Sequence, residues 1–439
     1  MQSTSPSRPE GPLGSRCRRW LVAGALAAVV AACGGGSGDD AGRQVTGAST
    51  STGAPAALGT APGNGTAVPI TPSPTPAPTA TTTFTVRVLD ADGQAGPLAL
   101  NAAGQVAFTV ARNDGLRAMV FNGTSVVEVA GPTSRATALN ANGQVTGEIR
   151  SASGGSRAYL WTAPGPATDL ATASGNTSIG EAVNAAGQVT GSLTVGSQRA
   201  RAFLWSPTTP MALLENIGGA TNPTGSSEAV QINEGGAVIG NATTPTGAVH
   251  AVQWRTGQRV RDLGTLGGRD SSARATNTAG DVVGHADTAV LGQRLAFVAT
   301  VAGTMRSLGA LGGKNSSAAA INDLGQVAGE AETTANATRA FLWEPTGGGT
   351  MRNLGTLGGA NSTAVAIGPT GQVCGSSETA DGLPHAFLWS VAEGMVDLNN
   401  RLASASAGLV VQHCIALAGR SVLALSTAGL VLLQPTPAR

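Results

Sequence analysis

The sequence predicts an all-β protein, a β-propeller of about eight four-stranded blades, and three observations support this fold class. Glycine accounts for 63 of the 439 residues and charged residues for only 12%, a composition too glycine-rich for a helical protein and too apolar for a wholly disordered one. One motif recurs every 40–50 residues along most of the chain. Each copy holds four short apolar runs, and four strands in such a period are typical of a propeller blade.

An asparagine in an Asn-x-x-Gly turn marks six of the eight copies, and a short valine-containing strand follows it. The turn residues are Asn101, Asn140, Asn184, Asn233, Asn277 and Asn322, with Gly368 and Ala416 at the same position in the last two copies. Successive turns are 39 to 49 residues apart. Such spacing indicates one supersecondary unit per copy rather than several unrelated domains.

A second marker is an apolar run whose fourth position holds a tryptophan in five copies. These tryptophans are Trp161, Trp205, Trp254, Trp343 and Trp389. Strands packed on both faces by neighbouring blades should read as continuous apolar runs, and Ala-Phe-Leu-Trp does so. We therefore expect the indoles to fill the space between blades, rather than to stack on sugar rings at a surface.

The best copy shows the four expected strands, which we name a to d. They are Met351–Leu354 (a), Thr363–Ile367 (b), Gln372–Gly375 (c) and Ala386–Trp389 (d). The chain enters the repeats with the a-like run Phe84–Leu89 and leaves them with a strand d. This order predicts eight blades, or seven if the degenerate last copy does not form one. A β-solenoid is the alternative, but its coils repeat faster and need no large aromatic residue each.

The segments before the repeats predict export and a tether. Residues 1–32 combine arginines with a short apolar run, as a secretory signal peptide does, and Val30-Ala31-Ala32-Cys33 resembles the lipobox of bacterial lipoproteins. That resemblance implies acylation of Cys33 and an outer-membrane lipoprotein at the cell surface or on the periplasmic side. Residues 33–83 are rich in Gly, Ser, Thr and Pro, which predicts a disordered tether. The propeller should then occupy residues 84–434, with a tail at 435–439.

The repeats also resemble a known family. His385-Ala386-Phe387-Leu388-Trp389, the Leu-Gly-Thr-Leu-Gly-Gly segments and Gly-Gln-Val are similar to the bacterial extracellular HAF repeat, over about four-fifths of the chain. The resemblance implies export and brings no established activity. The histidine of the name occurs here only at His250 and His385.

Two features suggest where a ligand would bind. In an up-and-down blade the a–b and c–d connections lie on one face, here called the a–b/c–d face, and the c–d segments Ser376–Pro384, His285–Arg294 and Asn241–Val249 differ most. Variable loops on a rigid scaffold commonly carry recognition. A ring of basic residues should begin strand d on the same face: Arg117, Arg157, Arg201, His250, Arg339 and His385. This ring would attract anions, or each member would pair with a carboxylate such as Glu148 or Glu330; we favour pairing.

The remaining residues predict little chemistry. No nucleophile elbow, zinc helix, phosphate loop or calcium loop occurs, so we expect no catalytic residues, cofactor or metal site, and a net charge of +1 gives no nucleic-acid footprint. Export permits a disulfide between Cys374 and Cys414, which the sequence leaves open. We expect a monomeric, lipid-anchored binding or scaffold module for an unknown protein or glycan. The alternatives are a periplasmic envelope-assembly factor and a polysaccharide-active enzyme with carboxylates near the central channel.

Overall fold

The structure, a computed structural model, describes residues 82–436 apart from short gaps. The gaps are residues 91–95, 97, 152–153, 171–175, 223–224 and 404–407. The expected signal peptide, nearly all of the expected tether, Cys33 and the last three residues therefore lie outside the described part. Within that part, no helix is long and apolar enough to span a bilayer.

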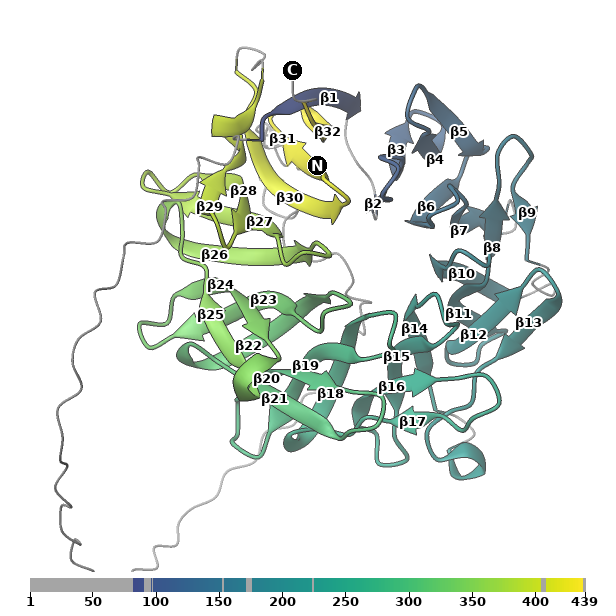
Figure 1. The fold of residues 1–439 in the computed structure, drawn as a ribbon. Helices are drawn as coiled ribbons and strands as arrows, with labels where there is room; N and C mark the ends of the chain where they lie inside the picture. Colours follow the sequence, from purple (N-terminus) through teal and green to yellow (C-terminus); the bar gives the residue numbers. More distant parts are fainter. Residues whose placement is uncertain are drawn as a thin grey trace, which may run out of the picture. The chain divides into compact units, whose positions relative to one another are not determined.

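The described residues form eight four-stranded antiparallel sheets arranged as the blades of a propeller (Figure 1). Blades 1 to 4 are β2–β5 (Ala99–Leu100, Val106–Arg112, Gly115–Phe121, Val126–Ala130), β6–β9 (Ser134–Leu139, Val145–Arg150, Ser156–Trp161, Thr168–Asp169), β10–β13 (Asn176–Val183, Val189–Val195, Arg201–Ser206, Thr209–Leu213) and β14–β17 (Ser227–Ile232, Val238–Thr243, Val249–Trp254, Arg261–Asp262). Blades 5 to 7 are β18–β21 (Gly267–Thr276, Val282–Thr288, Arg294–Ala299, Met305–Gly309), β22–β25 (Gly312–Ile321, Val327–Thr333, Thr338–Glu344, Thr350–Asn353) and β26–β29 (Gly358–Ile367, Val373–Thr379, Pro384–Ser390, Gly394–Asp397). Three short 3-10 turns lie in connections: η1 (Gly219–Thr221), η2 (Thr346–Gly348) and η3 (Leu398–Arg401).

Blade 8 joins the two ends of the repeat region. Its strands β30 (Val411–Ala418), β31 (Ser421–Ser426) and β32 (Gly429–Pro435) are completed by β1 (Phe84–Asp90), which pairs antiparallel with β32. The expectation of eight blades is confirmed. The grouping of strands differs from the sequence prediction, because strand a is the outermost strand of the preceding blade and each blade has the order b, c, d, a. The a–b connection therefore joins two blades.

The third strand of each blade supplies much of the core, as the apolar runs predict. In β24, Ala340, Phe341 and Leu342 are fully buried, and Trp343 is 4% exposed. Trp161, Trp254 and Trp389 are buried as well, whereas Trp205 is partly exposed. Four of the five indoles are therefore buried in the core as predicted, and Trp205 packs at the edge of the apolar cluster that blades 2 and 3 share.

A glycine in the second strand explains part of the unusual composition. The first strand of the blade bulges beside this position; at Gly284 the bulge lies between Ala273 and Ala275. A Cβ atom on Gly284 would lie 1.9 Å from the carbonyl oxygen of Ser272, and Gly375 has the same contact with Thr363. Only glycine lets the two backbones approach so closely.

Two repeated hydrogen bonds join neighbouring blades. A buried serine in the first half of the first strand accepts a bond from an alanine N–H in the third strand of the preceding blade, as Ser316 does from Ala296 at 2.8 Å. The equivalent serines are Ser134, Ser178, Ser227, Ser271 and Ser362. On the opposite face the turn asparagines form a belt, in which Asn322, for example, donates to the carbonyl of Gly368 in the next blade. The sequence markers are thus inter-blade contacts.

Candidate functional site

The basic ring lies on the expected face, but most of its members are engaged within their own blades. His385 contacts Asp397 at 2.6 Å and His250 contacts Asp262 at 2.9 Å. Arg117 pairs with Glu128, at 2.6 Å, and with Asp114, and Arg157 pairs with Asp169. The carboxylates Glu128, Asp169, Asp262 and Asp397 belong to the outermost strands of the respective blades.

The other two members of the ring bind backbone carbonyls. Arg201 donates to the carbonyl oxygen of Leu214 at 2.9 Å, and burial lowers its pKa. Arg339 donates to the carbonyl oxygens of Thr338 and Ala360. Pairing with a carboxylate, which we favoured over an anion-attracting rim, is therefore found for four of the six members. The suggested partners Glu148 and Glu330 were wrong, because the sequence could not show that strand a, with its acidic residue, lies beside strand d of the same blade.

The c–d connections are shorter than the sequence suggested, because strand pairing continues into them. Glu378 pairs with Pro384, and Asp287 pairs with Arg294, so these acidic residues lie on strands. The remaining loops of blades 4, 6 and 7 span five residues, each closed by a backbone bond from the first residue to the fifth: Thr244–Ala248, Thr333–Ala337 and Thr379–Leu383. The equivalent loop of blade 5, Thr288–Gln293, has six. Its tip carries Val290 and Leu291, which are 61% and 103% exposed.

A cleft of about 770 Å³ opens beside this longer loop, between blades 5 and 6 on the a–b/c–d face. Its volume falls in the range of small-molecule sites. The loop Thr288–Gln293 and the start of β18 form one side, and Asn315 and Thr338 of blade 6 lie on the other. No phenylalanine, tyrosine or tryptophan is among the described residues that line it.

Four polar residues from two blades meet in the cleft: Arg274 and His285 of blade 5, and Ser317 and Glu330 of blade 6. Ser317 and His285 face each other across the blade boundary, with 3.4 Å between Oγ and Nδ1. Ser317 is also the register partner of Glu330. These residues occupy repeat positions. His285 and Glu330 each follow the second-strand glycine of their blade, and Arg274 and Ser317 lie on the first strands, β18 and β22.

The electrostatics of the cleft are balanced. Burial, together with the charges of Arg294 and Arg274, lowers the pKa of His285 to about 4, so its imidazole is neutral at pH 7. Burial raises the pKa of Glu330, and Arg274 opposes this. At the rim Arg294 pairs with Asp287 at 3.0 Å, and Asn315 hydrogen-bonds Glu332 and thereby lowers its pKa. Within the described chain, Glu330 accepts no hydrogen bond and forms no ion pair, which leaves its carboxylate available.

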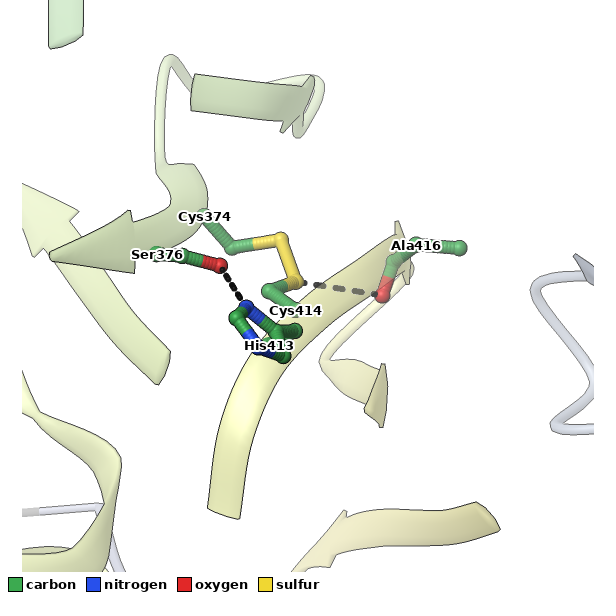
Figure 2. Close-up of a disulfide and its surroundings, with 5 residues drawn as sticks. All are labelled: Cys374, Ser376, His413, Cys414 and Ala416. Atoms are coloured by element: carbon green, nitrogen blue, oxygen red, sulfur yellow. Dashed lines mark hydrogen bonds between the residues drawn. A yellow bond between two sulfur atoms is a disulfide. The ribbon is translucent and has the colours of Figure 1, made fainter. Parts of the chain in front are cut away.

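Cys374 of β27 and Cys414 of β30 form a disulfide, with Cα atoms 6.1 Å apart (Figure 2). The bond joins blade 7 to blade 8. His413 and Ser376 lie beside it and form a 3.1 Å contact between Nδ1 and Oγ. This pair occupies the same two positions as Ser317 and His285, with the residue types exchanged.

The described residues hold no group of three or more His, Cys, Asp or Glu side chains that suits a metal ion. The cleft offers hydrogen-bond donors and acceptors on a fixed β-scaffold, an arrangement that suits contact with a polar molecule. The sequence alone did not predict this cleft. The signal was present, because a polar residue follows the repeat glycine at Glu148, Ser192, Asn241, His285, Glu330 and Ser376, but only the folded blades show which of these share a cleft.

No family model matches the chain. No curated protein matches it either. Similar solved structures include the β-propeller domain of the Trilobed protease from Pyrococcus furiosus, with 9% identity, a TM-score of 0.42, and coverage of 72% of this chain and 98% of that one. The BP39L lectin from Burkholderia pseudomallei has 10% identity, a TM-score of 0.38 and coverage of 72% and 97%. TolB from Acinetobacter baumannii has 10% identity, a TM-score of 0.35 and coverage of 75% and 79%.

Proposed function

We propose that this chain is an exported, lipid-anchored binding module of the HAF-repeat type, which holds a ligand on its a–b/c–d face without transforming it. The cleft between blades 5 and 6 carries the proposal. It combines a volume of about 770 Å³ with an available carboxylate at Glu330 and a loop that is one residue longer than its counterparts in blades 4, 6 and 7. Recognition through an irregular loop on a repetitive scaffold is a common use of a propeller.

Export and anchoring rest on the lipobox-like Val30–Cys33 and on the disulfide. Disulfides persist in oxidising compartments and are rare in the cytosol, so Cys374–Cys414 accords with a protein outside the cytoplasm. Two acyl chains on Cys33 would give lasting membrane attachment. Cys33→Ala should move the chain from the membrane fraction to the soluble exported fraction. Retention of the variant in the membrane fraction would contradict anchoring at this residue.

Hydrogen exchange of the full chain, with and without a solubilised cell-envelope fraction, tests ligand binding. We expect slower exchange in Thr288–Gln293 and at the start of β18, with the asparagine turns of the opposite face unchanged. Replacing Thr288–Gln293 with the five-residue Thr379–Leu383 sequence should abolish this protection and leave the melting temperature unchanged. Protection confined to the asparagine face, or protection that survives the loop exchange, would rule out this face.

A further inference from the structure

From the cleft we infer the class of ligand: the geometry points to an uncharged, hydroxyl-rich chain, that is, a neutral oligosaccharide, bound between blades 5 and 6 through Glu330, His285 and Ser317. This inference rests on the proposed function, because it takes the same cleft as the binding site. It adds the chemical class of the ligand and names the residues that would recognise it.

The charges of the cleft argue against a ligand with a net charge. The lining contains three arginines (Arg269, Arg274 and Arg294) and three carboxylates (Asp287, Glu330 and Glu332). An anionic ligand would face Glu330, and a cationic ligand would face Arg274. Because like charges repel each other, either ligand would lose part of the attraction that the opposite charge supplies.

The hydrogen-bonding groups favour hydroxyls. Glu330 presents acceptor oxygens, whereas the neutral imidazole of His285 has one donor and one acceptor nitrogen, and the hydroxyl of Ser317 both donates and accepts. A sugar hydroxyl likewise donates and accepts, so adjacent hydroxyls can satisfy this mixed set without a charge of their own. Glu330 is exposed on β23, so a ligand hydroxyl can reach its carboxylate, and hydrogen bonds to a charged acceptor are stronger than those to a neutral one.

The size and openness of the cleft favour a chain of sugars over a single small molecule. A volume of about 770 Å³ is in the upper part of the range typical of small-molecule sites. The aliphatic side chains of Val290 and Leu291 border the cleft and are exposed. They give the C–H faces of sugar rings an apolar surface, while the hydroxyls meet the polar side chains. Without an aromatic platform in the described lining, binding should depend mainly on hydrogen bonds.

The experiment is isothermal titration of the full chain with four-unit probes of different charge. Neutral probes are an array of hexose and pentose tetrasaccharides, and the others are tetragalacturonate (anionic), chitosan tetramer (cationic) and tetra-alanine (zwitterionic peptide). We expect saturable binding of at least one neutral probe and weaker binding of all charged probes. Glu330→Gln should weaken neutral binding roughly tenfold or more, because hydrogen bonds to a charged acceptor are the strong ones.

Matched variants separate the cleft from general effects. Ser317→Ala should also weaken binding, whereas Ser376→Ala alters the equivalent Ser–His pair beside the disulfide and should leave binding unchanged. Glu378→Gln changes the counterpart of Glu332 in blade 7, away from the cleft, and should have no effect. The melting temperature of each variant shows that it is folded.

Failure of this inference differs from failure of the proposed function. If no neutral probe binds, or if a charged probe or the peptide binds more tightly, the ligand class is wrong. An unchanged affinity in both Glu330→Gln and Ser317→Ala would overturn the assigned residues. In each case, envelope-induced protection of Thr288–Gln293 would still support the binding face. Shortened products after incubation with a bound sugar would uphold the ligand class and overturn the non-catalytic role.

Discussion

At the scale of single residues, the structure uses a few positions in each repeat for one physical task. The second-strand glycine allows the bulged first strand to approach, the first-strand serine caps a backbone N–H of the preceding blade, and the turn asparagine both closes its own turn and donates to the next blade. Ser362, for example, accepts from Ala340 at 3.0 Å and donates to Gly355 at 2.6 Å. Each of these residues contacts backbone atoms of a neighbouring strand or blade. The residues beside them are therefore free to vary and to carry function.

Substitution of a repeat glycine should be severely destabilising. In Gly284→Ala the new Cβ would lie 1.9 Å from the carbonyl oxygen of Ser272, and relief of that overlap requires a backbone shift, so we expect a loss of about 3 kcal/mol in unfolding free energy. Gly131→Ala is the control, because no atom lies within 4 Å of its Cβ position. Denaturant unfolding compares the two. Equal effects would show that close approach does not explain the repeat glycine.

Glu181, on the first strand of blade 3, should make stability depend on pH. Burial, together with the charges of Glu228 and Glu148, raises its pKa to about 7 against the opposing effect of Arg135. The folded state therefore binds a proton more tightly than the unfolded state, so this contribution to stability is present below pH 4.5 and is lost as the pH rises through 7.

Glu181→Gln removes this titration. Because the side chain is partly accessible to solvent, we expect a gain of about 1–2 kcal/mol at pH 8 and little change at pH 4.5. Chemical unfolding across pH 4.5–8 measures the difference. Glu228→Gln is the companion variant, since loss of its charge should lower the pKa of Glu181. A constant difference between Glu181→Gln and the parent protein across this range would contradict the assignment.

At the scale of strands and blades, the boundary between blades 7 and 8 differs from those before it. The serine position of blade 8 is Val411, and the asparagine position of blade 7 is Gly368, so neither repeated hydrogen bond can form there. Cys374 and Cys414 instead join the two blades covalently. Because the two irregularities and the disulfide coincide, we interpret the disulfide as the substitute for the missing polar contacts.

Loss of the disulfide should loosen blade 8 first. Cys374→Ser/Cys414→Ser should lower the unfolding free energy by about 2–4 kcal/mol. Native-state hydrogen exchange should show reduced protection in β30 to β32 and in β1, with blades 2 to 6 unchanged. Reductant should reproduce the effect on the parent protein and leave the double variant unaltered. Uniform loss of protection around the ring would argue against a local role.

The sequence predicts the repeated elements far better than the site. Blade number, the core role of Trp161, Trp254, Trp343 and Trp389, and the turn asparagines follow from spacing, because each recurs and noise averages out across copies. The grouping of strand a with the preceding blade does not follow, since the repeat has no marked beginning. The cleft depends on Arg274, His285, Ser317 and Glu330, which occupy repeat positions whose residue type differs from copy to copy, and a combination that occurs once leaves no periodic signal.

At the scale of the whole molecule, β1 completes blade 8 and so closes the ring between the two ends of the repeat region. Its Phe84 is 2% exposed and lies in the same apolar cluster as Val431 and Leu433 of β32. Without β1, the edge of β32 would be unpaired and its apolar side chains would lose a covering strand. Such an edge recruits other chains and promotes aggregation.

Deletion of residues 1–90 should therefore lower the melting temperature by about 10 °C or more and promote oligomers, because burial of a complete strand is lost. Deletion of residues 1–81 is the control, since it keeps β1 and should leave the melting temperature unchanged. A synthetic peptide of residues 82–90, added to the longer deletion, should pair with β32 and restore both stability and the monomer. Differential scanning calorimetry and light scattering report the two effects. If the longer deletion melts like the control, the ring is held by its inter-blade contacts alone, and β1 is dispensable for closure.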